Sequence, residues 1–549
     1  MVHVQSKSGL TITSHTTQNE FLSILLKNRG LKTNEITEFF NPPHPRSLPV
    51  TDFGIDGKQL SKAIVTIHQA INGHKNILIY GDYDVDGITS TALLWHALNA
   101  QKAKVTPFVP DRHRDGYGFK YTSLIAFEQE KNIRFDLVIT VDNGIVAHRD
   151  LSQLVEEKRQ IIVIDHHLPD SQLDKSIIVI HSTSVSGSIL AWLVAKEFEP
   201  TVDIGLAALG AVADCVPLIK ANRSIVVHGL QSLRVNPNLG IKKVLEISHR
   251  RQDTLSATDL GFIIGPRINA VGRLSNPTDA LRLLCSTSLA QATKYASILE
   301  DYNKDRQLLQ SDHLAEAEKG VKKHQDKIII FASKNFSAGI IGLVAGRLLE
   351  KYYVPTIIMS IEDGFAKGSC RSIPQVNIIE ELRKLSPLFE DLGGHASAAG
   401  FTIKTKNIPR FKKKFTHQIN TLLAKVDLSP SILVDAQMTL SATTIRNCQL
   451  ISKLEPFGIG NPQPLFLFKG ARIASKRLLG SNGDHLKLTL DDPNTPYPEN
   501  IPASAIAFKK GELDKILKIG EIVDIIASLE INEWQGNHSA QLIIKEIIY

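Results

Sequence analysis

The sequence has few cysteines and no hydrophobic run long enough to cross a membrane. Its four cysteines, Cys215, Cys285, Cys370 and Cys448, lie far apart and form no C-x-x-C pair, so neither a disulfide framework nor a cysteine zinc site is expected. No run of about 18 apolar residues occurs, and the opening stretch MVHVQSKSGLTITSH has no apolar signal core. These absences predict no membrane partner and a reducing, cytoplasmic location.

A strong charge bias is also missing. The 549 residues include 63 Lys and Arg against 56 Asp and Glu, which is a net charge of +7. Such an excess permits a polyanionic partner, but a solvated surface of mixed charge has the same total. The hydrophobic share of 43% is ordinary for a globular protein. The length predicts three or four domains of about 100–200 residues each.

Short apolar runs alternate with helix-like segments over residues 55–215. Predicted strands cover residues 76–80, 137–139 and 161–164, with helices over Gly57–Asn72 and from about Thr89. This alternation predicts an α/β fold with a parallel sheet covered on both faces. Residues 1–50 are predicted as a short helical lead-in that prolines end. Residues 225–320 are mainly helical, residues 326–425 return to an α/β pattern, and short alternating runs after residue 431 predict a β-barrel.

Three aspartates follow the first of these strands at alternate positions. They are Asp82, Asp84 and Asp86 in ILIYGDYDVDG. Ligands of an open α/β sheet bind beyond the carboxyl ends of its strands, and carboxylates crowded there need a cation or must take up protons. Alternate spacing in an extended loop can aim the three side chains at one centre. An acidic loop that is only solvated is the alternative, and the EF-hand pattern is absent.

Acidic or imidazole side chains end three further apolar elements. FDLVITVDNG places Asp142 after a strand, IIVIDHH places Asp165, His166 and His167 after another, and GLAALGAVADCVP contains Asp214. One such residue alone is more often a cap or a core residue, but agreement over four elements favours a metal site. Ligands rich in oxygen suit Mg²⁺ or Mn²⁺. The number of candidates is sufficient for two ions, a pair that can activate water and hold a phosphoryl group.

These motifs resemble those of a known family. YGDYDVDG, VDNG, DHH and ADCVP match, in chain order, the four acidic motifs of the DHH phosphoesterase superfamily. PDRHRDGYG (110–118), GPRINAVGRL (265–274), KGSCRS (367–372), GGHASAAG (393–400) and LEPFGIGNPQPLF (454–466) are similar to motifs of its RecJ branch. The resemblance covers about residues 50 to 549. It implies a single-stranded-DNA-specific 5′→3′ exonuclease that releases nucleoside monophosphates by two-metal-ion phosphodiester hydrolysis, in DNA repair and recombination.

The resemblance also implies an order of domains. An N-terminal segment (1–50) should precede a DHH parallel-sheet catalytic domain (51–225), a long helical connector (226–320), a DHHA1 α/β domain (321–428) and a C-terminal OB-fold β-barrel (429–549). The DHH and DHHA1 domains are expected to face each other across a cleft. A single-strand binding protein and a helicase are the partners that the resemblance implies beside single-stranded DNA.

The family's acidic motifs assign roles to individual residues. The metal ligands carried over are Asp82, Asp84, Asp86, Asp142, His166 and Asp214. The catalytic residues are Asp142, His166, His167 and Asp165: Asp142 is the candidate bridging ligand, His167 is expected to contact the scissile phosphate, and Asp165 is expected to orient the histidines. No side-chain nucleophile is required.

A 5′-phosphate needs binding residues of its own, and arginine matches phosphate geometry. The candidates are Arg112, Asn269, Arg273, Ser369, Arg371, Gly394 and His395. Arg371 and His395 are preferred to Arg267, for which a structural ion pair is the alternative. A close helix–strand turn is the alternative for GGHASAAG. In the barrel, Trp534, Phe508 and Lys509 are candidate strand contacts, with plain packing and surface positions as the alternative.

Two departures from the RecJ pattern bear on the substrate. Phe336 and Ser337 stand before GIIG where the pattern has Trp-His, which predicts the loss of a DNA-contacting imidazole and an adjusted substrate preference. Residues 179–188 replace a longer Asn-Pro segment. Two other functions stay open: a phosphodiesterase for short oligonucleotides or cyclic dinucleotides, and a non-catalytic single-strand-binding protein. A strand-tracking barrel argues against the first, and the complete set of expected ligands argues against the second.

Overall fold

The computed structural model describes residues 3–549 except 113, 117, 322–325, 481, 495–500 and 535. The chain forms two compact units. One comprises Met1–Leu48, Pro217–Val227 and Ser429–Tyr549, and the other comprises Pro49–Val216 and His228–Leu428. Within the described ranges, no helix combines the length and apolar character that a membrane span requires.

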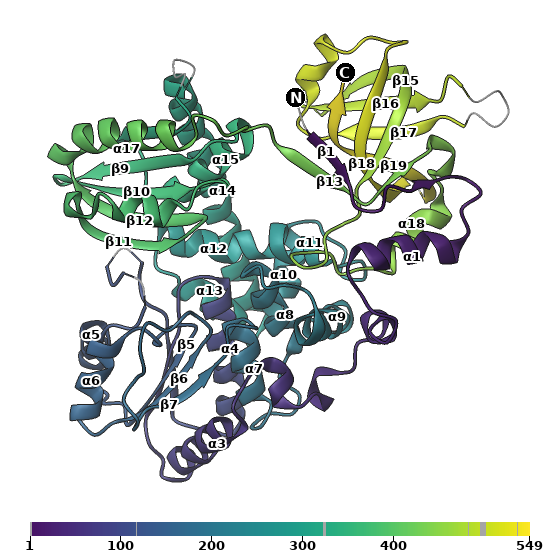
Figure 1. Ribbon diagram of the computed structural model, residues 1–549. Coiled ribbons are helices and arrows are strands. Elements are labelled where there is room, and N and C mark those ends of the chain that lie inside the picture. The colour runs from purple at the N-terminus through teal and green to yellow at the C-terminus, as the bar shows by residue number, and fades with distance from the viewer. Residues whose placement is uncertain are drawn as a thin grey trace. The chain divides into compact units, whose positions relative to one another are not determined.

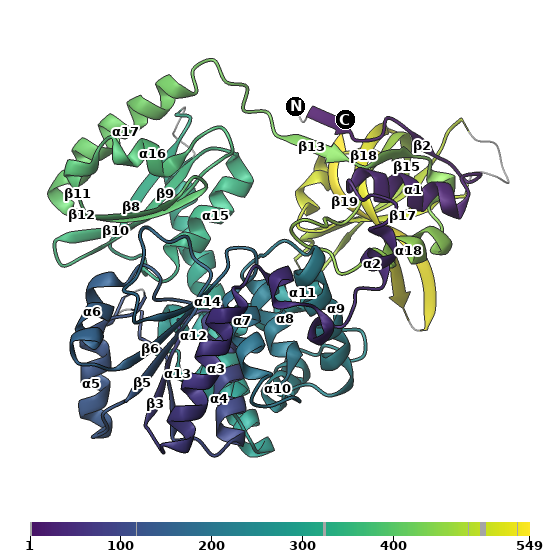
Figure 2. The same cartoon turned by 60° about the horizontal axis from the view of Figure 1, so that its bottom comes forward.

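The larger unit contains a parallel five-stranded sheet with the order β4-β3-β5-β6-β7. Its strands are β3 (Ile77–Tyr80), β4 (Val105–Phe108), β5 (Leu137–Val141), β6 (Gln160–Asp165) and β7 (Ile178–His181). Helices cover both faces of the sheet (Figures 1 and 2): α3 (Gly57–Asn72), α4 (Val85–Ala100), α5 (Tyr121–Lys131), α6 (His148–Glu156) and α7 (Gly187–Ala195). Every residue of β3 and β5 is buried, as strands between two helical layers require. The predicted α/β parallel sheet is confirmed.

The order of these strands creates a crevice at one edge of the sheet. Strand β3 comes first in the chain but lies between β4 and β5. The connections that follow β3 and β5 therefore leave toward opposite faces, and ligands of such sheets bind at this switch point. Asp82 follows β3 after a single glycine, and Asp142 directly follows β5.

A helical region follows the sheet. It contains α8 (Ile204–Ala213), α9 (Lys220–Val235), α10 (Leu239–Ile247), α11 (Ala257–Asp259), the π-helix η3 (Leu260–Ile264), α12 (Gly265–Leu274), α13 (Thr278–Leu284) and α14 (Leu289–Val321). The periodic segment from residue 279 onward forms two helices, α13 and α14. The break occurs at residues 285–288, where the side chain of Ser288 accepts a hydrogen bond from the N–H of Gln291 at the start of α14.

The larger unit also contains a mixed sheet with the order β11-β12-β10-β9-β8. The strands are β8 (Ile329–Ser333), β9 (Thr356–Glu362), β10 (Phe365–Arg371), β11 (Phe389–His395) and β12 (Ala398–Lys404), packed with α15 (Ile341–Tyr352), α16 (Ile378–Arg383) and α17 (Ile408–Leu422). GGHASAAG is therefore a β-hairpin, and the helix–strand turn considered for it is wrong. Gly394 has φ 142°, and a Cβ there would lie 2.5 Å from the carbonyl oxygen of Ala398, so close pairing explains the glycine.

The smaller unit is built around a closed five-stranded barrel. Its strands are β15 (Phe466–Leu479), β16 (His485–Asp491), β17 (Ala503–Ala507), β18 (Ile522–Trp534) and β19 (Asn537–Ile548). The barrel closes because β15 pairs with both β16 and β18. The predicted C-terminal barrel is confirmed.

The first residues of the chain belong to this smaller unit. Strand β1 (His3–Ser6) pairs in parallel with β13 (Ser431–Val434), and β2 (Thr11–Ile12) pairs with β14 (Ala436–Met438). Helices α1 (Gln18–Asn28), α2 (Ile36–Phe40) and α18 (Ile445–Ser452) contribute to the core that contains the barrel residues. The N-terminal segment is thus partly β-structured rather than only helical, because strands of two and four residues with partners more than 400 positions away leave no periodic pattern.

Arg223 of α9 is a buried residue that links separate segments of the smaller unit by hydrogen bonds. Its guanidinium donates hydrogen bonds to the backbone carbonyls of Phe39, Leu454 and Glu455, and it lies 3.9 Å from the centre of the Phe39 ring. The side chain is only 2% exposed. Burial, followed by the charge of Arg29, lowers the pKa of Arg223 to about 10.

Replacing Arg223 with methionine should destabilise the smaller unit. The change removes the guanidinium from all three carbonyls and leaves that of Phe39 without this donor, at a cost of about 1–3 kcal/mol, whereas the carbonyl of Leu454 still accepts a hydrogen bond from Nδ2 of Asn461 (2.8 Å). Differential scanning calorimetry should show a lower melting temperature for the transition of this unit. The exposed Lys453→Ala variant is the control and should melt like the wild type. Unchanged melting of Arg223→Met would contradict the assignment.

Candidate active site

The first acidic motif forms a strand-to-helix junction. Asp82 follows β3, but α4 already begins at Val85, so Asp84 is its N-cap and accepts a hydrogen bond from the N–H of Gly87 (3.1 Å). Asp86 lies in the first helical turn. The expected extended loop and the helix start near Thr89 are therefore wrong, because carboxylates at an N-cap and in a first turn stabilise a helix N-terminus. A Cβ at Gly87 would lie 2.5 Å from the carbonyl oxygen of Asp82.

Asp86 connects two helices. Its carboxylate accepts hydrogen bonds from the N–H groups of Gly187 (2.6 Å) and Ser188 (3.0 Å) at the N-terminus of α7. Its Oδ2 also lies 3.9 Å from Nε2 of His166. A carboxylate oxygen has two lone pairs, so these contacts leave it able to act as a ligand. The sequence holds no sign of the bond to α7, which depends on two segments about 100 residues apart.

Asp142 occupies a backbone conformation that non-glycine residues seldom adopt. Its φ is 60°, and its N–H donates a hydrogen bond to the carbonyl of Ile164 (2.9 Å) on β6. Its Oδ1 lies 3.1 Å from Nε2 of His166. Left-handed backbone at a non-glycine residue costs free energy and concentrates at functional sites.

Asp165 organises the DHH motif. One carboxylate oxygen accepts hydrogen bonds from the N–H groups of His166 (2.7 Å) and His167 (3.2 Å) and lies 2.7 Å from Nδ1 of His167. The other accepts from the N–H of Ile145 (2.9 Å). Because its lone pairs are taken by these donors, Asp165 fixes the loop and the ring of His167 from behind. It is absent from the groups of side chains that converge as metal ligands.

Asp214 completes the acidic cluster from the C-terminal end of α8. It is the C-cap of that helix, and its Oδ2 lies 3.7 Å from Nδ1 of His166. The imidazole of His166 therefore has Asp142 near one ring nitrogen and Asp214 near the other. The side chain of Asp214 is 27% exposed, so this part of the cluster is open to solvent.

The side chains of this cluster fit divalent cations. Ligand atoms converge within 4.8 Å in three groups, which are Asp82 with Asp84 and Asp142, Asp86 with His166 and Asp214, and Asp142 with His166 and His167. Oδ1 of Asp82 and Oδ1 of Asp142 are buried and accept no hydrogen bond, although buried carboxylate oxygens normally have partners. Several carboxylates with an imidazole suit Mn²⁺ or Mg²⁺. Asp142 belongs to two of the groups, as a ligand shared between two ions must.

The electrostatics of the cluster show how strongly it needs a cation. Burial and then the charge of Asp84 raise the pKa of Asp82, and burial with the charges of Asp86 and Asp84 raises that of Asp142. Burial, then Asp86 and Asp84, raise the pKa of Asp214 to about 8. Burial lowers the pKa of His166. A bound cation removes this penalty by favouring the ionised carboxylates.

His167 differs from its neighbour. Burial alone would lower its pKa, but the hydrogen bond to Asp165 and the charge of Asp165 outweigh burial, so the pKa is raised. The same bond keeps the pKa of Asp165 below its usual value despite burial. The pair therefore favours an imidazolium beside the acidic cluster.

Predicted phosphate-binding arginines gather next to these carboxylates. Burial, followed by the charges of Arg112, Arg306 and Arg371, lowers the pKa of Arg273 to about 10, while the charge of Asp84 opposes this shift. Arg273 donates a hydrogen bond to the carbonyl of Gly339 (3.2 Å). Arg112 lies 5.3 Å from the centre of the Tyr83 ring. Cations that destabilise one another's charge at a buried position form a site that an anion would stabilise.

Ser369 and Arg371 share this region with the N-terminus of α15. Nη1 of Arg371 lies 3.4 Å from Oγ of Ser369 and donates to the carbonyl of Cys370 (2.8 Å). A Cβ at Gly342 would lie 3.1 Å from Ser369 Oγ and 3.3 Å from Arg371 Nη2. Glycine thus allows the first turn of α15 to approach both side chains, and helix N-termini favour anions.

Other predicted residues lie apart from these clusters. Gly394 and His395 are exposed on the β11–β12 hairpin, where Nδ1 of His395 lies 3.1 Å from Oγ of Ser397. Asn269 is half-buried on α12. Arg267 pairs with Glu300 (2.7 Å) at 14% exposure of each side chain, which is the structural ion pair considered for it.

The candidate strand contacts of the barrel are on its surface where the structure describes them. The side chain of Phe508 is 52% exposed, and its ring centre lies 5.3 Å from that of His485. The N–H of Lys509 donates to Nδ1 of His485 (2.9 Å). The side chain of Trp534 lies outside the described residues.

The departure at Phe336 and Ser337 has a structural counterpart. Phe336 is 4% exposed, and its ring centre lies 4.8 Å from that of His313 on α14. The N–H of Ser337 donates to Nε2 of His313 (3.1 Å). These residues therefore serve packing between α14 and the mixed sheet.

Arg306 is a cation near the arginine cluster that the sequence does not reveal. It lies on α14, and its guanidinium donates to the amide oxygens of Asn303 (2.7 Å) and Gln310 (3.0 Å). Its segment has the periodicity of a connector helix, so no local motif marks it.

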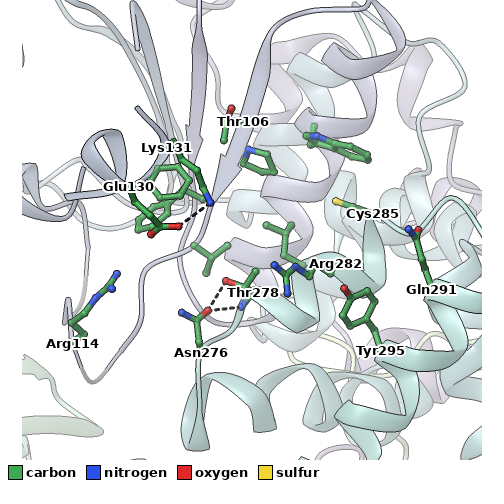
Figure 3. Close-up of a pocket in the computed structure, with 16 residues that line it drawn as sticks. Thr106, Arg114, Glu130, Lys131, Asn276, Thr278, Arg282, Cys285, Gln291 and Tyr295 are labelled. Atoms are coloured by element: carbon green, nitrogen blue, oxygen red, sulfur yellow. Dashed lines mark hydrogen bonds and ion pairs between the residues drawn. The ribbon is translucent and has the colours of Figure 1, made fainter. Parts of the chain in front are cut away.

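A cavity of about 520 Å³ lies elsewhere in the larger unit (Figure 3). It is bounded by residues of α4, β4, α5, α13 and α14, among them Trp95, Thr106, Lys131 and Tyr295. Lys131 pairs with Glu130 (2.8 Å) on one wall. None of the predicted site residues lines this cavity, so the acidic cluster stays the candidate active site.

Comparisons with known proteins agree with this arrangement. Three family models match: the DHH family N-terminal domain at residues 76–216, the DHHA1 domain at 325–421 and the RecJ OB domain at 434–546. Each match lies within one of the five parts predicted from the sequence, whose boundaries stay predictions.

The curated relatives that this chain resembles are named as exonucleases specific for single-stranded DNA. The single-stranded-DNA-specific exonuclease RecJ of Bacillus subtilis is 32% identical over 95% of this chain and 67% of its own length. That of Salmonella typhimurium is 30% identical over 89% of this chain and 90% of its own length. The crystal structure of RecJ from Thermus thermophilus in complex with Mn²⁺ matches with a TM-score of 0.82 and 26% identity, covering 98% of this chain and 79% of that one.

Without metal ions, the raised carboxyl pKa values predict a stability that falls as pH increases. The pKa of Asp214 is about 8 in the folded protein against 3.8 ordinarily. Between these values the folded state holds a proton that the unfolded state has released, so rising pH favours unfolding. The melting temperature of EDTA-treated protein should fall between about pH 5 and about pH 8, and excess Mn²⁺ should reverse this fall.

The Asp214→Asn variant is the matched control for this prediction. It removes the titrating group and should make the melting temperature of the EDTA-treated protein less dependent on pH. Equal pH dependence of the variant and the wild type would contradict the assignment.

Proposed function

The chain belongs to the RecJ family of single-stranded-DNA-specific exonucleases, and from this premise we propose how its residues divide between hydrolysis and recognition of the 5′ end. The protein is a metal-dependent exonuclease on single-stranded DNA, with Mn²⁺ or Mg²⁺ as cofactor. The observation that carries the proposal is the convergence of buried carboxylate oxygens of Asp82 and Asp142 at the switch point of the parallel sheet, where neither Oδ1 accepts a hydrogen bond and that of Asp142 lies 3.1 Å from Nε2 of His166.

The acidic cluster would hold two ions. Asp82 and Asp84 would bind one ion, and His166 with Asp214 and Asp86 the other, with Asp142 between them. When bound, the ions supply activation of water and a clamp for the phosphodiester. Asp165 holds the ring of His167 and favours its protonated form, and a protonated imidazole donates a charge-assisted hydrogen bond to a phosphate oxygen.

The arginine cluster is proposed to bind the 5′-phosphate. Arg273, Arg371 and Arg112 are close enough to perturb one another, and Ser369 adds a hydroxyl donor. Asp84 acts on Arg273, so the phosphate site adjoins the acidic cluster. A phosphate held there sets the distance from the 5′ end to the hydrolysed bond. This arrangement supports 5′→3′ polarity and the release of nucleoside monophosphates.

The barrel and the resemblance to the family support proposals about DNA binding, cellular role and partners. The barrel supports a role in holding single-stranded DNA, and we infer a role in DNA repair and recombination with a single-strand binding protein and a helicase as partners. All four cysteines are free thiols, which suits the reducing cytoplasm.

End-resolved digestion tests the polarity and the metal cluster together. A single-stranded DNA labelled at its 3′ end, incubated with protein and Mn²⁺, should shorten progressively from the 5′ end. Asp142→Asn should lower the rate by more than about 100-fold, the upper range for loss of a group that only supports a metal ligand. Asparagine tolerates the left-handed backbone of this position, so the fold should persist.

The exposed Asp301→Asn variant serves as the matched control and should digest at the wild-type rate. Shortening from the 3′ end would refute the proposed polarity. Hydrolysis of a dinucleotide with an intact long strand would place the protein among phosphodiesterases for short substrates.

Strands that carry either a phosphate or a hydroxyl group at the 5′ end test the proposed phosphate site. Arg371→Ala should lower kcat/KM on a 5′-phosphorylated strand by roughly 10–100-fold, because a hydrogen bond to a charged group contributes about 1.5–3 kcal/mol. The loss on a 5′-hydroxyl strand should be clearly smaller. Arg383→Ala, an exposed arginine of α16, is the control. Equal losses on both strands would assign Arg371 a structural role instead.

A further inference from the structure

An exposed aromatic side chain lies at the start of the helix that carries Arg273. Phe262 is 76% exposed, compared with 52% for Phe508 and 41% for Phe365. It belongs to the π-helix η3, which continues into α12 with helical backbone at the junction. Short π-helical turns are often found at functional sites. A large apolar ring in water therefore stands on the element that leads to the proposed phosphate site.

Phe262 is the first residue of a stripe along this helix. Pro266, Asn269 and Arg273 follow at spacings of four, three and four positions, which places all four residues on one side of a helix. Each of the four is exposed or half-buried, residues 264, 265, 268 and 270–272 are buried, and the half-buried Ile263 and Arg267 lie on another side of the helix. The stripe is thus the most open side of η3 and α12: it is exposed at Phe262 and half-buried from Pro266 to Arg273, whose guanidinium donates a hydrogen bond to the carbonyl of Gly339.

Contacts of the other sides fix the orientation of the stripe. Gly272 packs against the carbonyl oxygen of Tyr83, where a Cβ would come within 2.8 Å. Arg267 is held by Glu300 of α14. One side of the helix therefore meets the parallel-sheet domain and another meets α14, which leaves Phe262 on a remaining side.

The stripe is long enough to contact several nucleotides of a single strand. Arg273 comes eleven positions after Phe262, which corresponds to roughly 16 Å at 1.5 Å per residue. At its far end, the charge of Arg273 interacts with Arg371, Arg112 and Asp84. A strand whose 5′-phosphate binds at this end can extend along the open side of the helix, whereas a dinucleotide is too short to reach Phe262.

We propose that Phe262 stacks on a base of the bound single strand a few nucleotides from its 5′ end. The inference rests on the proposed 5′-phosphate site and adds a positioning residue to it. Every base presents a π-face, so stacking on an aromatic ring holds a strand without reading its sequence. This suits an enzyme that must advance along any sequence, and the continuity with Arg273 favours a nucleic acid over a protein as the occupant.

Affinity and turnover of Phe262→Ala test the proposal. Stacking of one base contributes about 1–3 kcal/mol, so kcat/KM on a long 5′-phosphorylated strand should fall by roughly 5–150-fold. The fall on a 5′-phosphorylated dinucleotide should be much smaller, and the ratio of the two kcat/KM values is the decisive quantity. Phe262→Trp should restore the activity on the long strand because it preserves an aromatic face.

Leu308→Ala is the matched control, since Leu308 is an apolar side chain of α14 with 64% exposure. It should match the wild type on both substrates. Equal losses of Phe262→Ala on the long strand and the dinucleotide would overturn the proposal in favour of a structural role. Wild-type kinetics of Phe262→Ala on both would also overturn it, and would point to a protein partner for this surface.

Strand binding in EDTA separates this inference from the exonuclease proposal. Fluorescence anisotropy with a labelled 5′-phosphorylated strand should show the affinity of Phe262→Ala reduced by the same factor, with no hydrolysis required. A wild-type protein that binds the strand but hydrolyses nothing would defeat the proposed hydrolysis while the anisotropy still decides stacking. Equal affinities of the variant and the wild type would defeat the stacking alone.

Discussion

The repulsion among carboxylates at the switch point of the parallel sheet is the constraint on which the active site depends. Asp82, Asp84 and Asp142 are brought together by strands β3 and β5, whose hydrophobic burial on both faces fixes where the chain must turn. The N-termini of α4 and α7 stabilise Asp84 and Asp86 through backbone N–H groups. No such donor reaches Oδ1 of Asp82 or of Asp142. The fold therefore supplies part of the stabilisation and leaves a remainder that divalent cations provide.

A second cluster of like charges lies against the first. Arg273 and its neighbouring arginines disfavour one another's charge, while Asp84 favours that of Arg273. Two clusters of opposite sign thus share one edge, each stabilised by a different component of the reaction. Cations stabilise the carboxylates, and in the proposed function the 5′-phosphate of the strand would stabilise the arginines.

Much of this organisation could be predicted from the sequence because it depends on local patterns. Strands β3, β5 and β6 are continuous apolar runs, and a carboxylate after each of them marks the sheet edge. The parts that could not be predicted depend on distant segments. Strands β1 and β2 pair with residues beyond 430, and Asp86 accepts hydrogen bonds from the N-terminus of α7. The charge of Arg306 on α14 affects Arg273, which lies far from it in the sequence. The start of α4 was misplaced although its signal was present, since Asp84 at an N-cap position competes with a role as a metal ligand.

Phe336 and Ser337, which depart from the family pattern, both contact His313 of α14. His313 of α14 packs against the ring of Phe336, and its Nε2 accepts a hydrogen bond from the N–H of Ser337. Burial lowers the pKa of His313, which favours the neutral ring that can accept this bond. A neutral, hydrogen-bonded imidazole cannot attract a phosphate by charge. A charged histidine before α15 is therefore not part of the proposed recognition of the strand, which rests on the arginine cluster and on the stacking surface proposed at Phe262.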